Sequence, residues 1–193
     1  MRIIGITGGI GSGKSTIARE LVLRGYAVYD CDREAKLIIT ENSDVRQQIV
    51  ELLGPEAFSD GKYNTDYVSR RVFAEPKLLE ALNGIVHPAV VQDILRQAVP
   101  ILFVESAILY ESEIDRLCEQ IVVVEAPEEI RLQRTIERDY HGEATEENIN
   151  NVRARIRAQA QPFDRKGKTP VIRILNDGRT SVPKLAEQII VRL

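Results

Sequence analysis

Residues 8 to 15 hold the side chains best suited to do chemistry, in a glycine-rich turn that carries a lysine and a serine. The sequence is GGIGSGKS, in which Gly8 and Gly13 to Ser15 satisfy G-x-x-x-x-G-K-[ST]. In this pattern, backbone N–H groups surround phosphate at the start of a helix, the lysine reaches the β- and γ-phosphates, and the hydroxyl suits Mg2+. We therefore predict a phosphate-binding loop. The expected nucleotide-binding residues are Gly11, Ser12, Gly13, Lys14, Ser15 and Thr16, and Ser15 is also an expected magnesium ligand.

Two other interpretations fit this turn less well. A chance glycine turn is disfavoured because the apolar residues before it are typical of a buried strand and an apolar helical pattern follows it. A dinucleotide-binding loop needs G-x-G-x-x-G or G-x-G-x-x-A with an acid about 20 residues later, where Asp30 and Asp32 lie. Counted from Gly9, however, the last position of that pattern is Lys14.

Composition limits the class of protein. At 193 residues and 44% hydrophobic content, the chain can bury a full core, as one domain with insertions or as a core with a small subdomain. The formal charge of -3 argues against a general nucleic-acid binder. Met1 leads directly into a predicted strand, and no apolar stretch approaches membrane-spanning length. We expect a cytoplasmic protein with no nucleic-acid or membrane partner, and the oligomeric state stays open.

The cysteines and histidines do not indicate a metal centre. Cys31 and Cys118 form neither a C-x-x-C pair nor a metal-ligand cluster, which favours two reduced thiols. His87 and His141 are too far apart in sequence to suggest a metal site by themselves.

Five apolar runs typical of buried strands recur along the chain, with helical patterns between them. They lie at residues 2 to 7, 26 to 30, 100 to 104, 121 to 125 and 171 to 175. This order predicts an α/β fold with a mostly parallel, five-stranded sheet. Ligands of such sheets bind beyond the carboxyl ends of the strands. Asp30 ends the second run and Glu105 follows the third, so we expect both acids near the phosphate-binding loop.

The interval from residue 32 to 99 is predicted to be a helical insertion, because it contains no convincing central strand and is longer than one crossover helix needs. Helical segments are expected at residues 34 to 39, 44 to 53, 66 to 73, 77 to 82 and 89 to 98.

A basic helical pair is expected after the fourth strand. Pro127 is suited to open a helix in which Arg131, Arg134 and Arg138 share one face. A second helix, at about residues 146 to 159, carries three more arginines. Residues 131 to 168 hold nine Lys/Arg against six Asp/Glu. A solvated charged face would explain this composition, but beside a phosphate-binding loop we favour an arginine-bearing lid.

Motifs along almost the whole chain resemble those of dephospho-coenzyme A kinases. The segment GYAVYDCDREAK, from Gly25 to Lys36, is similar to the second strand and following turn of that family, approximately G-x-x-V-I-D-A-D-x-I-A. Matching segments follow in order: SRRVF at 69 to 73, IVHP at 85 to 88, ESAILYE at 105 to 111, QRTIERD at 133 to 139, ARIRAQ at 154 to 159 and ILNDG at 174 to 178. None is decisive alone, and together they make a strong resemblance.

The resemblance implies transfer of the ATP γ-phosphoryl group, with Mg2+, to the ribose 3′-hydroxyl of dephospho-coenzyme A, the last step of coenzyme A synthesis. It implies a P-loop NTPase-type parallel five-stranded sheet flanked by helices, a helical acceptor-binding region and a helical lid. The corresponding ranges are 1–31, 100–126 and 167–193 for the core, 32–99 for the acceptor region and 127–166 for the lid.

The same resemblance implies the catalytic residues, Asp32, Lys14 and Arg138. Asp32 matches the acid that accepts the proton of the substrate hydroxyl. Two alternatives stay open for this region. Asp32 could instead be the N-cap of the next helix, and Asp30, which could serve the water shell of Mg2+, could exchange roles with Asp32.

Binding residues also follow from the resemblance. Arg138 and Arg155 are the lid arginines expected to meet phosphate, and Arg155 and Asn176 are expected in the nucleotide site. His87 could contact substrate, or could mark a helix boundary set by Pro88.

The third strand departs from the family pattern. The family usually has D-x-P-L-L-[FY]-E there, whereas this chain has ESAILYE, so Glu105 replaces an aspartate. The carboxylate is retained one methylene farther from the backbone, and we still expect Glu105 near the magnesium ion.

Two rival functions share parts of this pattern. Another nucleoside or nucleotide kinase would keep the loop and change the acceptor pocket. A nucleotide-dependent switch would keep the loop alone, but the chain has no N-K-x-D guanine-specificity motif, and a two-helix arginine lid suits phosphoryl transfer better than signalling.

Overall fold

The chain folds as two units in the computed structural model, which describes residues 1–159 and 169–193. Unit 1 comprises Met1–Tyr29 and Val99–Leu193, and unit 2 comprises Asp30–Ala98. Residues 160–166 of the expected lid, and 167 and 168 of the expected core, lie outside the described residues. In the described part of the chain, no helix is both long and apolar enough to span a bilayer.

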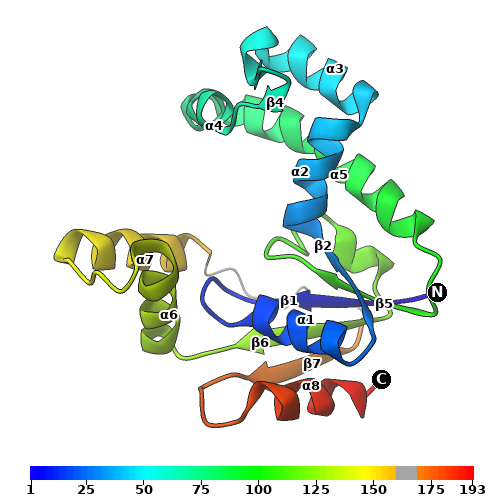
Figure 1. Ribbon diagram of the computed structural model, residues 1–193, viewed down its shortest axis with the longest axis vertical. Helices are drawn as coiled ribbons and strands as arrows, with labels where there is room; N and C mark the ends of the chain where they lie inside the picture. The colour runs from blue at the N-terminus through cyan, green and yellow to red at the C-terminus, as the bar shows by residue number, and fades with distance from the viewer. Residues whose placement is uncertain (160–168) are drawn as a thin grey trace. The chain divides into compact units, whose positions relative to one another are not determined.

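A five-stranded parallel sheet forms the framework, as predicted (Figure 1). Its strands are β1 (Arg2–Thr7), β2 (Ala27–Asp30), β5 (Ile101–Glu105), β6 (Gln120–Glu125) and β7 (Val171–Leu175). They lie in the order β2-β5-β1-β6-β7. The registered pairs place Ile6 opposite Glu105 on one side of β1 and opposite Val122 on the other. Because β5 and β6 lie on opposite sides of β1, the carboxyl end of β1 is a switch point, where ligands of open α/β sheets bind.

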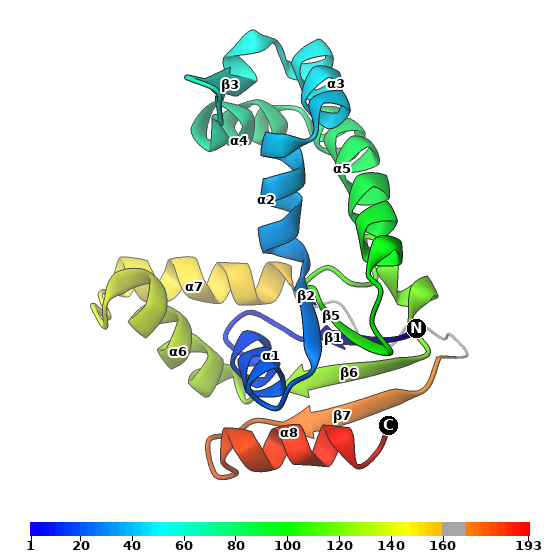
Figure 2. The same ribbon diagram turned by 45° about the vertical axis from the view of Figure 1, so that its right-hand side comes forward.

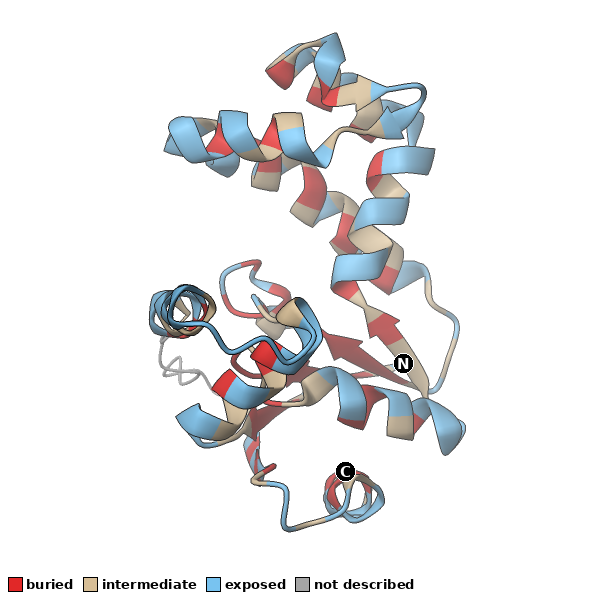
Figure 3. Ribbon diagram, turned by 60° about the vertical axis from the view of Figure 1, so that its left-hand side comes forward, coloured by how far each residue is buried: buried red, intermediate tan, exposed pale blue. Residues whose placement is uncertain are grey.

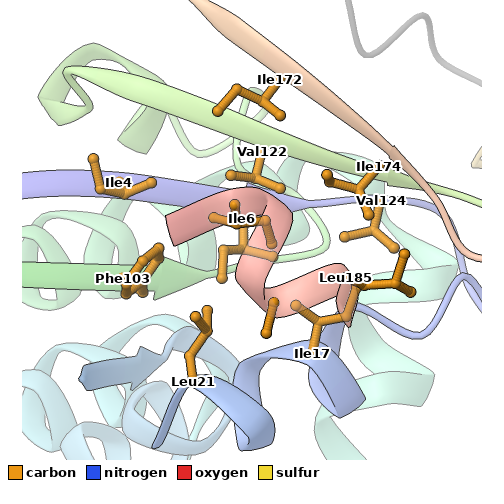
Figure 4. Packing of buried hydrophobic residues seen from close by; sticks show 12 residues of the cluster. Ile4, Ile6, Ile17, Leu21, Phe103, Val122, Val124, Ile172, Ile174 and Leu185 are labelled. Atoms are coloured by element: carbon orange, nitrogen blue, oxygen red, sulfur yellow. The ribbon is translucent and has the colours of Figure 1, made fainter. Parts of the chain in front are cut away.

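One face of this sheet packs against two helices, α1 (Lys14–Leu23) and α8 (Val182–Ile190). Figure 4 shows Ile17 and Leu21 of α1 and Leu185 of α8 beside buried strand residues such as Phe103. Each of these side chains is at most 1% exposed. Val22 belongs to the apolar pattern of this helix but is 53% exposed, because the packed stripe follows the spacing of Ile17, Ala18 and Leu21.

The arginine-bearing segment forms two packed helices, α6 (Glu128–Tyr140) and α7 (Glu146–Ala158) (Figure 2). Their own small core consists of Leu132, Ile136, Val152 and Ile156. Pro127 stands at the N-cap of α6, and the helix ends at His141 in the left-handed conformation. A short 3-10 helix, η2 (Ile114–Leu117), lies between β5 and β6.

Unit 2 is mainly helical. Its elements are α2 (Cys31–Glu41), α3 (Ser43–Leu53), η1 (Pro55–Ala57), β3 (Phe58–Ser59), β4 (Lys62–Tyr63), α4 (Thr65–Ala74) and α5 (Pro76–Arg96). The long helix α5 packs against α2, α3 and α4. Figure 3 shows buried positions recurring among exposed ones along these helices, as expected for amphipathic helices around a small core.

Two features of unit 2 differ from the sequence prediction. The segments at 77 to 82 and 89 to 98 are one continuous helix, with Pro88 inside it, so the alternative of a helix boundary set by Pro88 is wrong. The buried residues of α5 continue every four residues across this position, and Pro88 itself is exposed, so packing on one side overrides the local proline signal. The β3–β4 hairpin was also not predicted. Asp60 and Gly61 both have positive φ there, which is typical of an Asp-Gly hairpin turn.

Candidate phosphate-binding and catalytic site

The glycine-rich loop connects the central strand β1 to α1, and glycine is required at two of its positions. Gly11 has φ 74° and Gly13, the N-cap of α1, has φ 91°. These are left-handed conformations that favour glycine. A Cβ atom would also collide with the carbonyl oxygen of Arg131 at Gly11 and with the side-chain amide of Asn176 at Gly13. The loop thus brings the N-terminus of α1, with its unpaired N–H groups, to the switch point.

Lys14 and Ser15 converge on one carboxylate, that of Glu105, at the carboxyl end of β5. The Ser15 hydroxyl donates to Oε1 of Glu105 over 3.0 Å, and Nζ of Lys14 lies 3.9 Å from the same oxygen. The Lys14 and Glu105 side chains are only 14% and 8% exposed. A largely buried cation, a hydroxyl and a carboxylate therefore lie together at the start of α1, where a polyphosphate and its counter-ion could be bound.

The oxygen atoms of Ser15 and Glu105 suit a magnesium ion. Mg2+ prefers oxygen ligands, usually keeps several waters, and is commonly bound by one or two protein groups together with substrate phosphates. No cluster of three or more His, Cys, Asp or Glu that could hold a metal alone occurs among the described residues. Ser15 and Glu105 supply two oxygen donors, which fits an ion that shares its coordination with phosphates and water.

Asn176, expected at the nucleotide site, lies directly against the loop. Its side chain is buried, its Nδ2 donates to the carbonyl of Ser12 over 2.8 Å, and its Oδ1 accepts from Arg134 over 3.2 Å. Thr16 lies in the first turn of α1, and its hydroxyl accepts a hydrogen bond from Arg19 over 3.3 Å.

Three loop contacts were not foreseen. Arg131 donates from Nε to the carbonyl of Ile10 over 2.8 Å, and Arg134 donates to the carbonyl of Ser12 over 3.3 Å. Gln159 accepts from the Ile10 N–H over 2.6 Å. The shared helical face of the arginines was visible in the sequence, but nothing in the sequence indicated that two of them face the loop. Gln159 ends the segment ARIRAQ that resembles the family, but nothing in the sequence indicated that it would reach the loop.

The two arginines that the sequence analysis assigned to a lid, Arg138 and Arg155, share one carboxylate. Arg138 binds both oxygens of Asp139, over 2.6 and 3.2 Å, and Arg155 reaches Oδ2 of Asp139 over 2.7 Å. The hydrogen bond from Arg138, aided by that from Arg155, lowers the pKa of Asp139 to about 2. Both arginine side chains are about half exposed, at 59% and 48%, so they are accessible to a ligand and their ion pairs contribute little to stability.

In unit 2, Asp30 at the end of β2 and Asp32 just beyond it have different environments. Asp30 is the N-cap of α2, and its Oδ1 accepts from the Arg33 N–H over 3.1 Å. The alternative that Asp32 caps this helix is therefore wrong, since Asp32 lies inside the first turn and is exposed. Because capping does not occupy its carboxylate, Asp32 keeps an exposed group at the end of the helix that favours negative charge.

His87 lies half-buried within α5. Burial lowers the pKa of its imidazole below the ordinary value, so the neutral form predominates at neutral pH. A neutral imidazole can still donate or accept a hydrogen bond to a ligand.

These features define a P-loop kinase: a buried parallel sheet, a central strand followed by the loop GGIGSGKS, and a carboxylate beside Lys14 and Ser15. The family model described as dephospho-CoA kinase matches residues 2–181. The chain belongs to the dephospho-CoA kinase family.

Individual relatives agree with this assignment. The dephospho-CoA kinase of Bacteroides fragilis strain YCH46 is 34% identical over 96% of this chain and 90% of its own length. That of Chlorobaculum tepidum is 38% identical over 91% and 86%. Among solved structures, a Thermus thermophilus protein is 30% identical with a TM-score of 0.79, covering 99% of this chain and 96% of its own. A dephospho-CoA kinase from Campylobacter jejuni, at 22% identity, covers 100% and 97% with a TM-score of 0.65 and supports the fold alone.

Proposed function

We propose that this chain transfers the γ-phosphoryl group of ATP to the ribose 3′-hydroxyl of dephospho-coenzyme A, giving coenzyme A and ADP. The observation that carries the proposal is the convergence of Lys14 and Ser15 on Glu105 at the end of β5, beside the central strand, in a member of the dephospho-CoA kinase family. The partner is a small molecule, and the place of action is the cytoplasm.

In this reaction the loop binds the polyphosphate and Lys14 stabilises its charge. The loop N–H groups and the start of α1 face the β- and γ-phosphates, and the Lys14 ammonium, paired with Glu105 at 3.9 Å in the free protein, is redirected toward them. Ser15 and Glu105 would hold Mg2+, which supplies charge neutralisation of the phosphate oxygens when bound.

Asp32 is the group that we assign to the acceptor. The 3′-oxygen attacks the γ-phosphorus, the bond from that phosphorus to the β,γ-bridging oxygen breaks, ADP leaves, and the hydroxyl proton passes to the Asp32 carboxylate. Asp30 is committed to capping α2, which favours Asp32 over Asp30 for this role. His87 and residues 32–99 form the acceptor region of this proposal.

In this proposal, residues 127–166 form a lid. Once the lid closes, Arg138 and Arg155 contact the transferred phosphate. Their exposure and their shared anion, Asp139, support this role, because a phosphate oxygen can replace a carboxylate as the partner of a guanidinium. Lid closure also excludes water, so the phosphoryl group is not lost to hydrolysis.

The test is incubation of the purified chain with ATP, Mg2+ and dephospho-coenzyme A, with the product examined by mass and by phosphorus NMR. We expect one added phosphoryl group on the ribose 3′-oxygen. Lys14→Ala is the control, because it removes the charge of the loop lysine. This variant should lower the turnover number by about 10²-fold or more. No product with dephospho-coenzyme A, or a product phosphorylated elsewhere, would refute the proposal.

A further inference from the structure

Three carbonyl groups of the phosphate-binding loop accept hydrogen bonds from side chains in distant parts of unit 1. The Gly11 carbonyl accepts from Nη1 of Arg134 over 3.5 Å. The Ile10 carbonyl accepts from Nε of Arg131 over 2.8 Å. The Ser12 carbonyl accepts from Nδ2 of Asn176 over 2.8 Å and from Nη1 of Arg134 over 3.3 Å. Carbonyl oxygens carry partial negative charge and therefore cannot bind an anionic ligand. The hydrogen bonds from two guanidiniums and an amide to these carbonyls therefore stabilise the conformation of the loop.

These donors are anchored in the sheet. Arg134 also donates to the carbonyl of Asn176 over 3.1 Å and to its Oδ1 over 3.2 Å. The Asn176 N–H in turn donates to the carbonyl of Glu125 over 2.8 Å, which extends the pairing between β6 and β7 by one residue. Asn176 is only 5% exposed. The Ser12 carbonyl is therefore connected, through buried Asn176, to the ends of β6 and β7.

Arg131, on α6, holds the Ile10 carbonyl. The Arg131 guanidinium lies so close to Gly9 that a Cβ atom there would collide with it. The Arg131 carbonyl would likewise collide with a Cβ atom at Gly11, and it accepts a hydrogen bond from the Thr135 hydroxyl over 2.7 Å. Gly9 and Gly11 thus leave room for α6 as well as for phosphate.

The geometry of the peptide group gives these contacts a consequence. In a trans peptide, the C=O of one residue and the N–H of the next point in opposite directions. Holding the Ile10 carbonyl on one side directs the Gly11 N–H to the other, and holding the Ser12 carbonyl does the same for the Gly13 N–H. The side chains behind the loop therefore determine where its phosphate-binding donors point.

We propose that Arg131, Arg134 and Asn176 are positioning residues that fix the phosphate-binding loop before the nucleotide arrives, by holding its carbonyls so that the N–H groups of Gly11 and Gly13 face the phosphates. Arg138, on the same helix, has a separate role because it is exposed and pairs with Asp139. The proposal rests on the proposed ATP-binding role of the loop. Preformed donors lower the cost of ordering on binding.

The first experiment measures backbone 15N relaxation at Gly11 and Gly13 in the full chain without nucleotide. In the wild type we expect rigid amides, with order parameters of about 0.85, and in Arg134→Met and Asn176→Leu a fall toward about 0.6. Arg138→Met is the matched control, since it removes a guanidinium from the same helix and should leave both amides rigid. If both amides stay as rigid in Arg134→Met and Asn176→Leu as in the wild type, the proposal is wrong.

The second experiment compares the affinity for ATP with that for inorganic tripolyphosphate. Loop positioning predicts that Arg134→Met and Asn176→Leu weaken both ligands by the same factor, about 10- to 100-fold, as expected for lost charged or buried hydrogen bonds. Loss of ATP affinity with unchanged tripolyphosphate affinity would instead make these residues nucleoside contacts and overturn the proposal.

Two further controls keep the outcomes separate. If Arg134→Met does not fold, Arg134→Lys, which retains the charge but not the two-pronged contact with Asn176, is measured in the same way and should show an intermediate loss of order. If the wild type binds neither ATP nor tripolyphosphate, the proposed function fails, while the relaxation measurement still decides whether these residues fix the loop.

Discussion

The hydroxyl oxygen of Ser15 lies 3.0 Å from Oε1 of Glu105, across the end of the central pair of strands. Glu105 stands where the resemblance to dephospho-coenzyme A kinases leads one to expect an aspartate. From the end of β5, the Glu105 carboxylate lies near both the Ser15 hydroxyl and the Lys14 ammonium. The longer side chain therefore retains a carboxylate beside the proposed magnesium ligand.

We predict that Ser15→Ala weakens the dependence of activity on Mg2+. Loss of the hydroxyl removes a proposed ligand and leaves the fold intact, since Ser15 is exposed. The magnesium concentration that gives half-maximal rate should rise by about 10-fold, the scale of one lost hydrogen bond or ligand contact. Ser15→Thr, which retains a hydroxyl, is the control and should behave like the wild type. Identical magnesium titrations for the wild type and Ser15→Ala would count against the assignment.

Substitution of Asp32 should affect the reaction rate much more than substitution of Asp30, the last residue of β2. Asp32→Asn should lower kcat by roughly 10²-fold or more, as expected for a lost acid-base group, and should leave ATP affinity largely unchanged. Asp30→Asn should be mild, because asparagine is as good an N-cap as aspartate and can accept the same hydrogen bond from Arg33. A larger rate loss for Asp30→Asn than for Asp32→Asn would mean that the two roles must be exchanged.

The lid arginines should act on the rate more than on the affinity for the acceptor. Arg138→Ala and Arg155→Ala remove guanidiniums that we place on phosphate only in the closed state, so the single-turnover rate should fall while the dissociation constant of dephospho-coenzyme A changes little. Asp139→Asn is the matched control, since it removes the shared anion but keeps both guanidiniums. Equal losses of affinity without a rate defect would indicate that the arginines bind the acceptor in the ground state.

The thiol of Cys118 should be inert in the folded protein. Burial, followed by the nearby Asp115 carboxylate, raises its pKa from the ordinary 9.0 to about 12. The thiolate is the reactive form, so at pH 8 Cys118 should resist a thiol reagent in the native state and react in denaturant, as followed by mass spectrometry of its peptide. The Cys118 thiol loses its proton at a lower pH in the unfolded chain than in the folded protein. The contribution of the buried thiol to the free energy of unfolding is therefore present below about pH 9 and is lost as the pH rises toward about 12. Rapid native labelling of Cys118 would show that this environment is wrong.

Much of the sheet and the loop could be predicted because their signals are local. A strand buried on both faces is a continuous apolar run, and GGIGSGKS contains the loop, its left-handed glycines and the helix start within a few residues. The hairpin at Asp60 and Gly61 also had a local signal, the Asp-Gly pair, although it was not recognised.

The remaining features depend on contacts that are distant in sequence. Whether Pro88 ends a helix was decided by the packing of α5, and which aspartate caps α2 was decided by where β2 stops. Arg131 and Arg134 meet loop residues more than 100 positions away, and a helical spacing shows only that they share a face, not what that face meets.

The most direct test of the proposed function is the kcat/KM of the purified chain for dephospho-coenzyme A, AMP and adenosine under identical ATP and Mg2+. We predict that dephospho-coenzyme A is preferred by about 10²-fold or more, because binding of its pantetheine arm to a long helical acceptor region can help to position the 3′-hydroxyl. A preference for AMP, with the new phosphate in a 5′-diphosphate, would contradict this account.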